Sequence, residues 1–284
     1  MRLRTISAIG VVLIGLIPAV LGGWFFAAVF TTIAVVAYRE AIAITYPNPT
    51  PIRLVGLTVV LFTGALAMLD SGPHALSVVV ALAVGAPLAA VVFLGIAQGI
   101  EQWTSITTTS LYLALPTLAA IDLRNAVDFP AHAWIQDWAG VLFGVSNSTG
   151  GGLAWFLLVL LVTWLSDTFA YLVGKPWGRR KLLPRVSPNK TFEGSAAGLV
   201  AAALTAVVCD MAFGMEIGAV WAIVVGLVLG VVGQVGDLSE SMLKRMRGVK
   251  DSGTFIPGHG GVLDRIDALI FVVVTAWILA PLFN

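Results

Sequence analysis

The chain has 284 residues, of which 58% are hydrophobic and only 11% are charged. A soluble domain with these proportions would expose large apolar patches, so the composition excludes an ordinary soluble protein and favours one embedded in a membrane. The formal net charge is only +1, which offers no broad basic surface for nucleic acid. Cys209 is the single cysteine, so an internal disulfide and a cysteine-based metal cluster are also excluded.

Uncharged stretches long enough to cross a bilayer recur along the whole chain. A hydrocarbon core about 30 Å thick requires roughly 20 apolar residues in each spanning helix. We predict nine such helices, near residues 6–22, 24–44, 53–69, 75–97, 103–121, 153–173, 195–213, 217–236 and 266–283. The predicted fold class is therefore an all-α polytopic membrane protein.

The distribution of basic residues predicts the orientation of these helices. With nine spans and a cytoplasmic N-terminus, Arg124 is the only one of the 16 Lys and Arg residues that falls outside. The other basic residues lie inside, as the positive-inside rule requires. We therefore expect the N-terminus and the two basic loops on the cytoplasmic side of the membrane. The alternative reading of the first 23 residues as a signal peptide is less favoured, because the apolar run is long and no clear cleavage site follows it.

The chain changes character near residue 150. Residues 1–150 are hydrophobic spans joined by short connections, to which we assign a scaffold role and contacts in a homodimer. Residues 151–284 place polar and charged side chains inside the spans and at their ends. This region includes two predicted cytoplasmic loops, 174–193 and 237–267, and we expect it to be catalytic.

Asp167 lies within an otherwise apolar span. A carboxylate there is costly unless it meets a cation, a metal ion or water, so Asp167 is a candidate functional residue. Two alternatives remain: a packing role in which Ser166 and Thr168 satisfy the carboxylate, and proton relay in a transporter.

Acidic and basic residues share helix faces in the second loop. If the eighth span continues as a helix beyond the membrane, Asp237, Ser241 and Lys244 stand at i, i+4 and i+7 and lie on one face. Asp264 and Asp267 are three residues apart at the start of the last helix, again on one face. The intervening segment, 248–261, is rich in glycine, which allows close backbone approach and leaves N–H groups able to face an anion.

This combination predicts a cation-assisted site for phosphate groups. Carboxylates without cysteine favour a hard cation, and Mg²⁺ is usually bound by one or two carboxylates plus substrate phosphates. We predict that Asp237 and Asp264 bind it. A basic cluster that only fixes topology and contacts anionic lipids would explain the cations but not the acidic residues among them. The cations are Lys244, Arg245, Arg247, Lys250 and Arg265.

Residues 241–267, SMLKRMRGVKDSGTFIPGHGGVLDRID, resemble the signature of the CDP-diacylglycerol synthase family, also called phosphatidate cytidylyltransferase. The fixed positions of that signature are present as Ser241, Lys244, Arg245, Lys250, Asp251, Pro257, Gly258, His259, Gly260, Gly261, Asp264, Arg265 and Asp267. An upstream stretch is similar to the family at Ser166, Asp167, Thr168, Ala170, Tyr171, Ser187, Pro188, Lys190, Thr191, Glu193 and Gly194. The motifs cover roughly residues 164–267, whereas the N-terminal half resembles the family only in hydropathy.

The resemblance implies an all-helical membrane enzyme, a homodimer, that converts CTP and phosphatidic acid to CDP-diacylglycerol and pyrophosphate with Mg²⁺. It also implies that Asp237 and Asp264 are ligands of the metal centre, which in the family can also hold a monovalent ion such as K⁺. The expected partners are thus CTP, phosphatidic acid, membrane lipids and a second copy of the chain.

A role follows for each remaining candidate. We expect Lys244, Arg245, Lys250 and Arg265 to offset charge on the departing pyrophosphate. Lys190 and Asp167 would complete a polar funnel that reaches lipid head-group depth. His259 alone is a weak indication, since a lone histidine is more often a hydrogen-bonded loop residue. The residues expected to bind substrate or orient other groups are Ser166, Ser187, Glu193, Ser241, Asp251, His259, Gly260, Gly261 and Asp267.

Two other classes of function remain as alternatives. A related CTP-using lipid enzyme, such as a polyprenol or phytol kinase or a synthase of archaeal CDP-lipids, would use the same phosphate chemistry. An ion-coupled transporter would account for Asp167 and the glycine-interrupted spans. The complete PGHGG and DRxD motifs favour the diacylglycerol enzyme.

Overall fold

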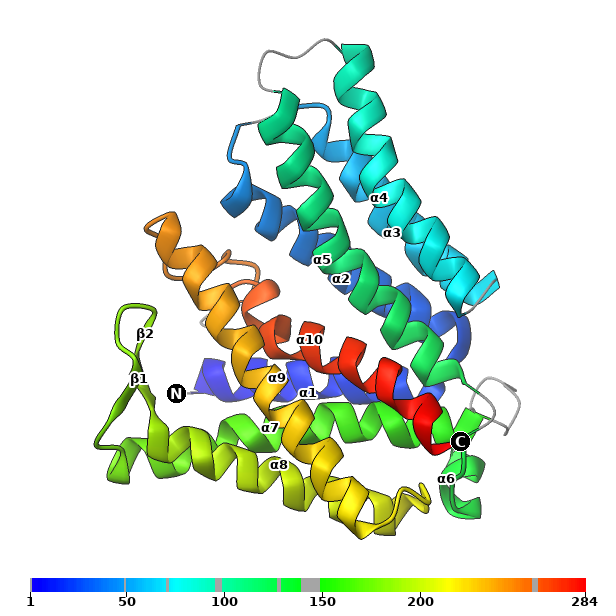
Figure 1. Ribbon diagram of the computed structural model, residues 1–284, viewed down its shortest axis with the longest axis vertical. Coiled ribbons are helices and arrows are strands. Elements are labelled where there is room, and N and C mark those ends of the chain that lie inside the picture. The colour runs from blue at the N-terminus through cyan, green and yellow to red at the C-terminus, as the bar shows by residue number, and fades with distance from the viewer. Residues whose placement is uncertain are drawn as a thin grey trace. The chain divides into compact units, whose positions relative to one another are not determined.

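The computed structural model describes residues 2–48, 50–69, 72–94, 99–126, 129–138, 149–256 and 260–284, which are predominantly helical (Figure 1). The helices are α1 (Arg2–Leu21), α2 (Gly23–Thr45), α3 (Arg53–Leu69), α4 (Pro73–Leu94), α5 (Gly99–Asn125), α6 (Ala133–Trp138), α7 (Gly150–Trp177), α8 (Phe192–Phe213), α9 (Ala219–Met246), α10 (Leu263–Leu279) and the short 3-10 helix η2 (Ala280–Phe283).

Seven helices in the described part of the chain are long and apolar enough to cross a membrane: α2, α4, α5, α7, α8, α9, and α10 together with η2. Two further apolar helices are shorter: Gly10–Leu21 within α1, and α3. Each of the nine predicted spans coincides with one of these nine helices. The prediction of a helical integral membrane protein is confirmed, while the count of nine crossings and the orientation of the N-terminus stay predictions.

The first predicted loop contains a small sheet that the all-α prediction missed. Strands β1 (Lys181–Leu183) and β2 (Ser187–Thr191) pair as an antiparallel hairpin between α7 and α8 (Figure 1). Helix α8 follows β2 directly, because Gly194 N–H donates to the Thr191 hydroxyl, which caps the helix, at 3.2 Å. This cap fixes the hairpin to the start of α8.

Contacts divide the chain into two compact units. Unit 1 contains Met1–Val12, Gly23–Asp122 and Asp251–Ile266, and in it α2 packs on α3 and α3 on α4. Unit 2 contains Leu13–Gly22, Leu123–Lys250 and Asp267–Asn284, and in it α8 packs against both α7 and α9. The division of the sequence into a scaffold and a catalytic region stays a prediction.

Arg124, at the end of α5, is completely buried within unit 2. Its Nε donates to the carbonyl of Ala19 and its Nη2 to that of Val20 at 3.1 Å, while Nη1 reaches the carbonyl and hydroxyl oxygens of Thr149 at 3.4 and 3.3 Å. The first two acceptors belong to the last turn of α1, where carbonyls have no partner within the helix. The one basic residue predicted to lie outside thus caps a helix from a buried position.

Replacing Arg124 with Met should destabilise the protein, because the methionine fills part of the volume but leaves several buried carbonyls without a donor. Each such group costs about 1–3 kcal/mol, so we expect a marked fall in melting temperature in detergent. Arg185→Met, which removes an exposed arginine in the hairpin turn, is the matched control. Equal melting temperatures for the two variants would contradict this role of Arg124.

Candidate functional site

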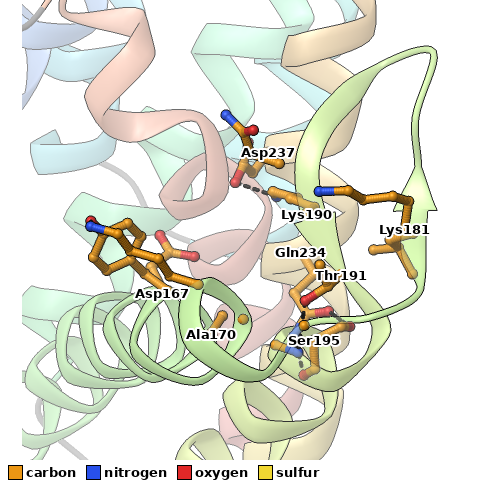
Figure 2. Close-up of a pocket in the computed structure, with 15 residues that line it drawn as sticks. Asp167, Ala170, Lys181, Lys190, Thr191, Ser195, Gln234 and Asp237 are labelled. Atoms are coloured by element: carbon orange, nitrogen blue, oxygen red, sulfur yellow. Dashed lines mark hydrogen bonds and ion pairs between the residues drawn. The ribbon is translucent and has the colours of Figure 1, made fainter.

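A pocket of about 560 Å³ lies in unit 2, between the end of α7, the hairpin, the start of α8, and α9 (Figure 2). This volume is in the usual range for small-molecule sites. Charges of both signs line the pocket, so it suits a ligand that carries phosphate together with a cation. Its polar lining comprises Asp167, Tyr171, Lys175, Lys181, Asn189, Lys190, Thr191, Ser195, Gln234 and Asp237.

An ion pair between Lys190 and Asp237 lies at the wall of this pocket. The Nζ of Lys190, on β2, contacts Oδ2 of Asp237, on α9, as Figure 2 shows. Both side chains are part-exposed, at 27% and 23%, so solvent and ligands can reach them. Asp167 lines the same pocket from α7. The structure therefore brings together three residues that the sequence analysis selected from separate segments.

Carboxylates from three helices of unit 2 act on one another near this pair. Asp237 interacts electrostatically with both Asp167 and Asp267, and Glu240 also acts on Asp267. Because neighbouring carboxylates repel one another, a cation that binds among them is favoured. Lys190 supplies one, and its ammonium group contacts the carboxylate that was predicted to bind metal. The cluster therefore suits a hard divalent cation in the type and charge of its ligands.

Metal binding at this cluster would depend on further ligands. Among the described residues, no three Asp, Glu, His or Cys side chains form a metal-binding group. Mg²⁺ commonly keeps several waters and takes one or two carboxylates plus substrate phosphates. The observed carboxylates fit that mode of binding, in which a phosphate ligand would bring part of the coordination shell.

Helix α9 extends to Met246, ten residues beyond the predicted span 217–236, and so meets the condition under which Asp237, Ser241 and Lys244 lie along one face. Lys244, however, is buried and its Nζ lies 2.5 Å from Oε2 of Glu240, which is itself only 1% exposed. The sequence analysis missed Glu240, although its spacing of four residues from Lys244 is the spacing of helical ion pairs. Within the described structure, Lys244 therefore neutralises a buried glutamate.

Two other predicted residues hold the hairpin. Arg245 donates to the carbonyl of Val249 at 3.2 Å and to that of Val186 at 3.4 Å, which ties the end of α9 to the hairpin turn. Glu193 accepts the backbone N–H groups of Arg179 at 3.0 Å and Arg180 at 3.3 Å. Both side chains thus support the shape of the pocket wall.

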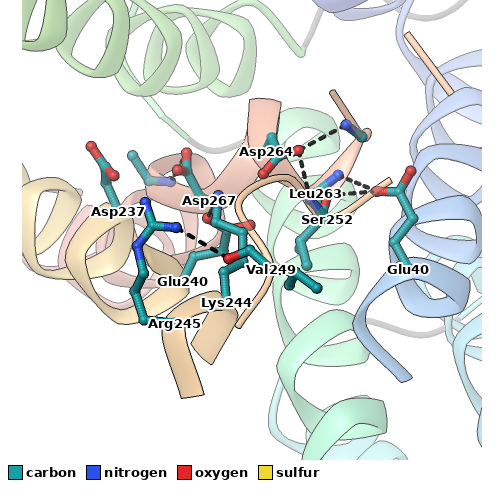
Figure 3. A network of polar contacts seen from close by, with 12 residues as sticks. Glu40, Asp237, Glu240, Lys244, Arg245, Val249, Ser252, Leu263, Asp264 and Asp267 are labelled. Carbon is teal, nitrogen blue, oxygen red and sulfur yellow. Dashed lines mark hydrogen bonds and ion pairs between the residues drawn. The ribbon is translucent and has the colours of Figure 1, made fainter. Parts of the chain in front are cut away.

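Glu40 and Asp264 form a polar network in unit 1 (Figure 3). Oδ2 of Asp264 accepts the backbone N–H groups of Ser252 at 2.9 Å and Gly261 at 2.8 Å. Glu40, on α2, accepts the N–H groups of Val262 at 3.1 Å and Leu263 at 2.8 Å, and the Ser252 hydroxyl at 3.1 Å. Sequence reasoning missed Glu40, whose only signal is an acidic residue near the end of an apolar span.

This network corrects one prediction about the glycine-rich segment. We expected its N–H groups to be free to face an anion, but those of Ser252 and Gly261 bind the protein's own Asp264, while for the rest of residues 248–261 the expectation stays a prediction. Gly260 has φ 81°, which favours glycine. A Cβ on Gly261 would overlap Oε2 of Glu40, so a side chain there would displace the carboxylate.

The remaining predicted residues are more dispersed. Ser166 is buried in α7, Ser187 begins β2, and Ser241 is part-buried on α9. Lys250, Asp251 and Arg265 have exposed side chains, and residues 257–259, which include His259, lie outside the described residues. Asp237 belongs to unit 2 and Asp264 to unit 1, so their pairing around one ion stays a prediction.

Comparison with known proteins identifies related chains. The chain is 44% identical over 140 residues to a phosphatidate cytidylyltransferase of Bacillus subtilis (strain 168), covering 49% of this chain and 52% of that protein. Proteins of the same name from Staphylococcus epidermidis (strain ATCC 35984) and Staphylococcus aureus (strain COL) are 45% and 48% identical over 122 and 125 residues, each covering 43% of this chain and 47% of the relative. These matches therefore span about half the length of each relative.

The match to a whole family is longer. The family model described as the cytidylyltransferase family matches residues 2–283, and so includes the pocket of unit 2 and the polar network of unit 1. The chain therefore belongs to the cytidylyltransferase family.

Proposed function

We propose that the protein is a phosphatidate cytidylyltransferase, which converts CTP and phosphatidic acid to CDP-diacylglycerol and pyrophosphate. Family membership and the names of the relatives support cytidylyl transfer. The observation that carries the proposal is the Lys190–Asp237 pair in a lysine-rich pocket of an integral membrane protein. Such a pocket can receive phosphate groups while the lipid chains stay in the bilayer.

The substrate can supply its own nucleophile in this reaction. A phosphate monoester has a second pKa near 6, so phosphatidic acid is largely dianionic at pH 7. One of its oxygens forms a bond to the α-phosphorus of CTP, the bond from that phosphorus to the bridging oxygen breaks, and pyrophosphate leaves. The protein then needs no strong base. It must hold two mutually repelling anions in line, with reacting atoms about 3–3.5 Å apart.

The cations of the pocket suit this task. Lys175 and Lys181 line it together with Lys190, and their ammonium groups can offset the charge of the two phosphates. Asp237 orients Lys190 through their ion pair, and Lys175 donates to the Tyr171 hydroxyl at 2.9 Å. We propose only secondary roles toward pyrophosphate for Arg245, Lys250 and Arg265. Arg245, for example, already binds the hairpin.

Mg²⁺ is part of the proposal, with Asp237 and Asp264 as the residues that would hold it and a monovalent ion such as K⁺ as an additional component. When bound, Mg²⁺ would offset the charge on the triphosphate oxygens. Asp264 is proposed as a ligand because its position matches the family motif and its carboxylate is an oxygen ligand of the kind that Mg²⁺ prefers.

We also propose nine crossings, a cytoplasmic N-terminus, a homodimer and a bacterial inner-membrane location with the site facing the cytoplasm. The distribution of Lys and Arg along the chain supports this orientation.

Incubation with CTP labelled at either the α or the γ phosphate tests the reaction type. Purified protein in detergent with Mg²⁺ and phosphatidic acid should incorporate the α label into lipid and release the γ label as pyrophosphate. Transfer of the γ label to lipid would instead identify a kinase, and the absence of any labelled lipid would refute the proposed function.

Removal of divalent cations should stop turnover, because the triphosphate would then meet the carboxylates of the pocket without a metal ion to offset their repulsion. Excess EDTA is expected to abolish formation of CDP-diacylglycerol, and added Mg²⁺ to restore it, with the melting temperature measured in parallel. Undiminished turnover in EDTA would remove the divalent cation from the proposal. Exchange of K⁺ for Na⁺ tests the monovalent ion in the same assay.

Asp264→Asn and Asp237→Asn should each lower kcat by at least about 10³-fold, a loss typical of removing a principal charge-stabilising group. In Asp264→Asn the amide oxygen of the new side chain can still accept the two backbone N–H groups, so we expect the folded protein to persist with little change in melting temperature. Asp137→Asn, at an exposed position in α6, is the matched control. Normal turnover in either site variant would exclude that residue from metal binding.

A further inference from the structure

We propose that Glu40 is a positioning residue for the reaction. It holds the segment that carries Asp264, by which we mean the described residues 252–256 and 260–264, and so fixes where the Asp264 carboxylate lies. The inference rests on the proposed function, because it assigns a second residue to the placement of a proposed metal ligand. Glu40 belongs to the N-terminal half of the chain, outside every motif that the sequence analysis selected.

Both oxygens of Glu40 are engaged with this segment. Oε1 accepts from Val262 N–H at 3.1 Å, and Oε2 accepts from Leu263 N–H at 2.8 Å and from the Ser252 hydroxyl at 3.1 Å. Leu263 is the first residue of α10. Glu40 therefore supplies, from a helix more than two hundred residues earlier, the acceptor that a neighbouring N-cap side chain commonly provides.

Ser252 joins Glu40 to Asp264. Its hydroxyl donates to Glu40 while its backbone N–H donates to Oδ2 of Asp264 at 2.9 Å. The same Asp264 oxygen accepts the N–H of Gly261, the residue directly before Val262. The carboxylates of Glu40 and Asp264 thus bind both ends of the segment. A change at Glu40 therefore affects Asp264 in two ways: through Ser252, which contacts both carboxylates, and through the adjacent backbone of residues 261–263.

The segment is built closely around the Glu40 carboxylate. A Cβ on Gly253 would lie 2.6 Å from Oε1, and a Cβ on Gly261 would overlap Oε2. A side chain at either position would therefore displace the Glu40 carboxylate from its place. Removal of the charge would leave the donors around it poorly paired, and a shift of about 1 Å in a ligand can cost about 10²-fold in rate.

The experiment compares Glu40→Gln with Glu101→Gln. Glutamine preserves the length of the side chain, but its NH₂ group must face at least one N–H donor. Glu101 is an exposed residue in the first turn of α5, in the same unit, so its substitution makes the same chemical change away from the network. Hydrogen exchange of the full-length protein, without CTP or Mg²⁺, reports on the segment independently of activity. Turnover with phosphatidic acid and CTP reports on the consequence.

We expect Glu40→Gln to speed exchange of the backbone amides of residues 252–256 and 260–263 by about 10- to 100-fold, the range for loss of hydrogen bonds to a charged group. It should also lower kcat by about 10- to 100-fold, as changes to residues that orient metal ligands do. The Mg²⁺ concentration needed for half-maximal rate should rise. The KM for phosphatidic acid should change less than about threefold, since the network contains no pocket residue. Glu101→Gln should match the unmodified protein in all four measurements.

Unchanged exchange in Glu40→Gln would overturn the proposal, and so would faster exchange with unchanged kcat and Mg²⁺ dependence. An equal response to Glu101→Gln would overturn it as well, because the effect would not be specific to the network. If the unmodified protein forms no CDP-diacylglycerol, the proposed function fails. The exchange measurement then still decides whether Glu40 holds the segment.

Discussion

The ion pair between Lys190 and Asp237 shows the constraint on which the candidate site depends: a carboxylate at the end of apolar helices must meet a cation or N–H donors. In unit 2, β2 brings Lys190 to Asp237, and the hairpin is held in place by the Thr191 cap and by Glu193. Other carboxylates accept hydrogen bonds from backbone N–H groups instead. Asp210, for example, accepts the N–H groups of Ile217 at 2.9 Å and Gly218 at 3.1 Å.

These two ways of satisfying a carboxylate have different consequences for chemistry. A carboxylate surrounded by backbone N–H groups, as Glu40 is, fixes the path of the chain and has little capacity left for a ligand. A carboxylate paired with a flexible, part-exposed lysine can exchange that partner for another cation, and the lysine can then meet an anion. The pocket of unit 2 has the exchangeable kind. The network of unit 1 has the fixed kind, at Glu40.

The sequence predicted those features that depend on local pattern. Apolar runs located the helices, whereas the continuation of α9 to Met246, which puts Asp237, Ser241 and Lys244 on one face, was only a condition of the sequence argument. The pairing of Lys244 with Glu240 was missed although both residues lie on one helix, because the family motif includes Lys244 but not Glu240. Glu40 and the cap made by Arg124 could not be predicted, since each contact joins residues more than a hundred positions apart and no local pattern encodes it.

The use of the backbone N–H groups decides how phosphate can be bound. A glycine-rich segment beside a helix start often offers N–H groups to an anion, yet here the N–H groups of Gly261, Val262 and Leu263 are donated to Asp264 and Glu40. Glycine in this part of the chain serves the approach of carboxylates. Since these three described donors are engaged, the proposed binding of phosphate would depend on cationic side chains, for which Lys175, Lys181 and Lys190 on the walls of the pocket of unit 2 are the candidates.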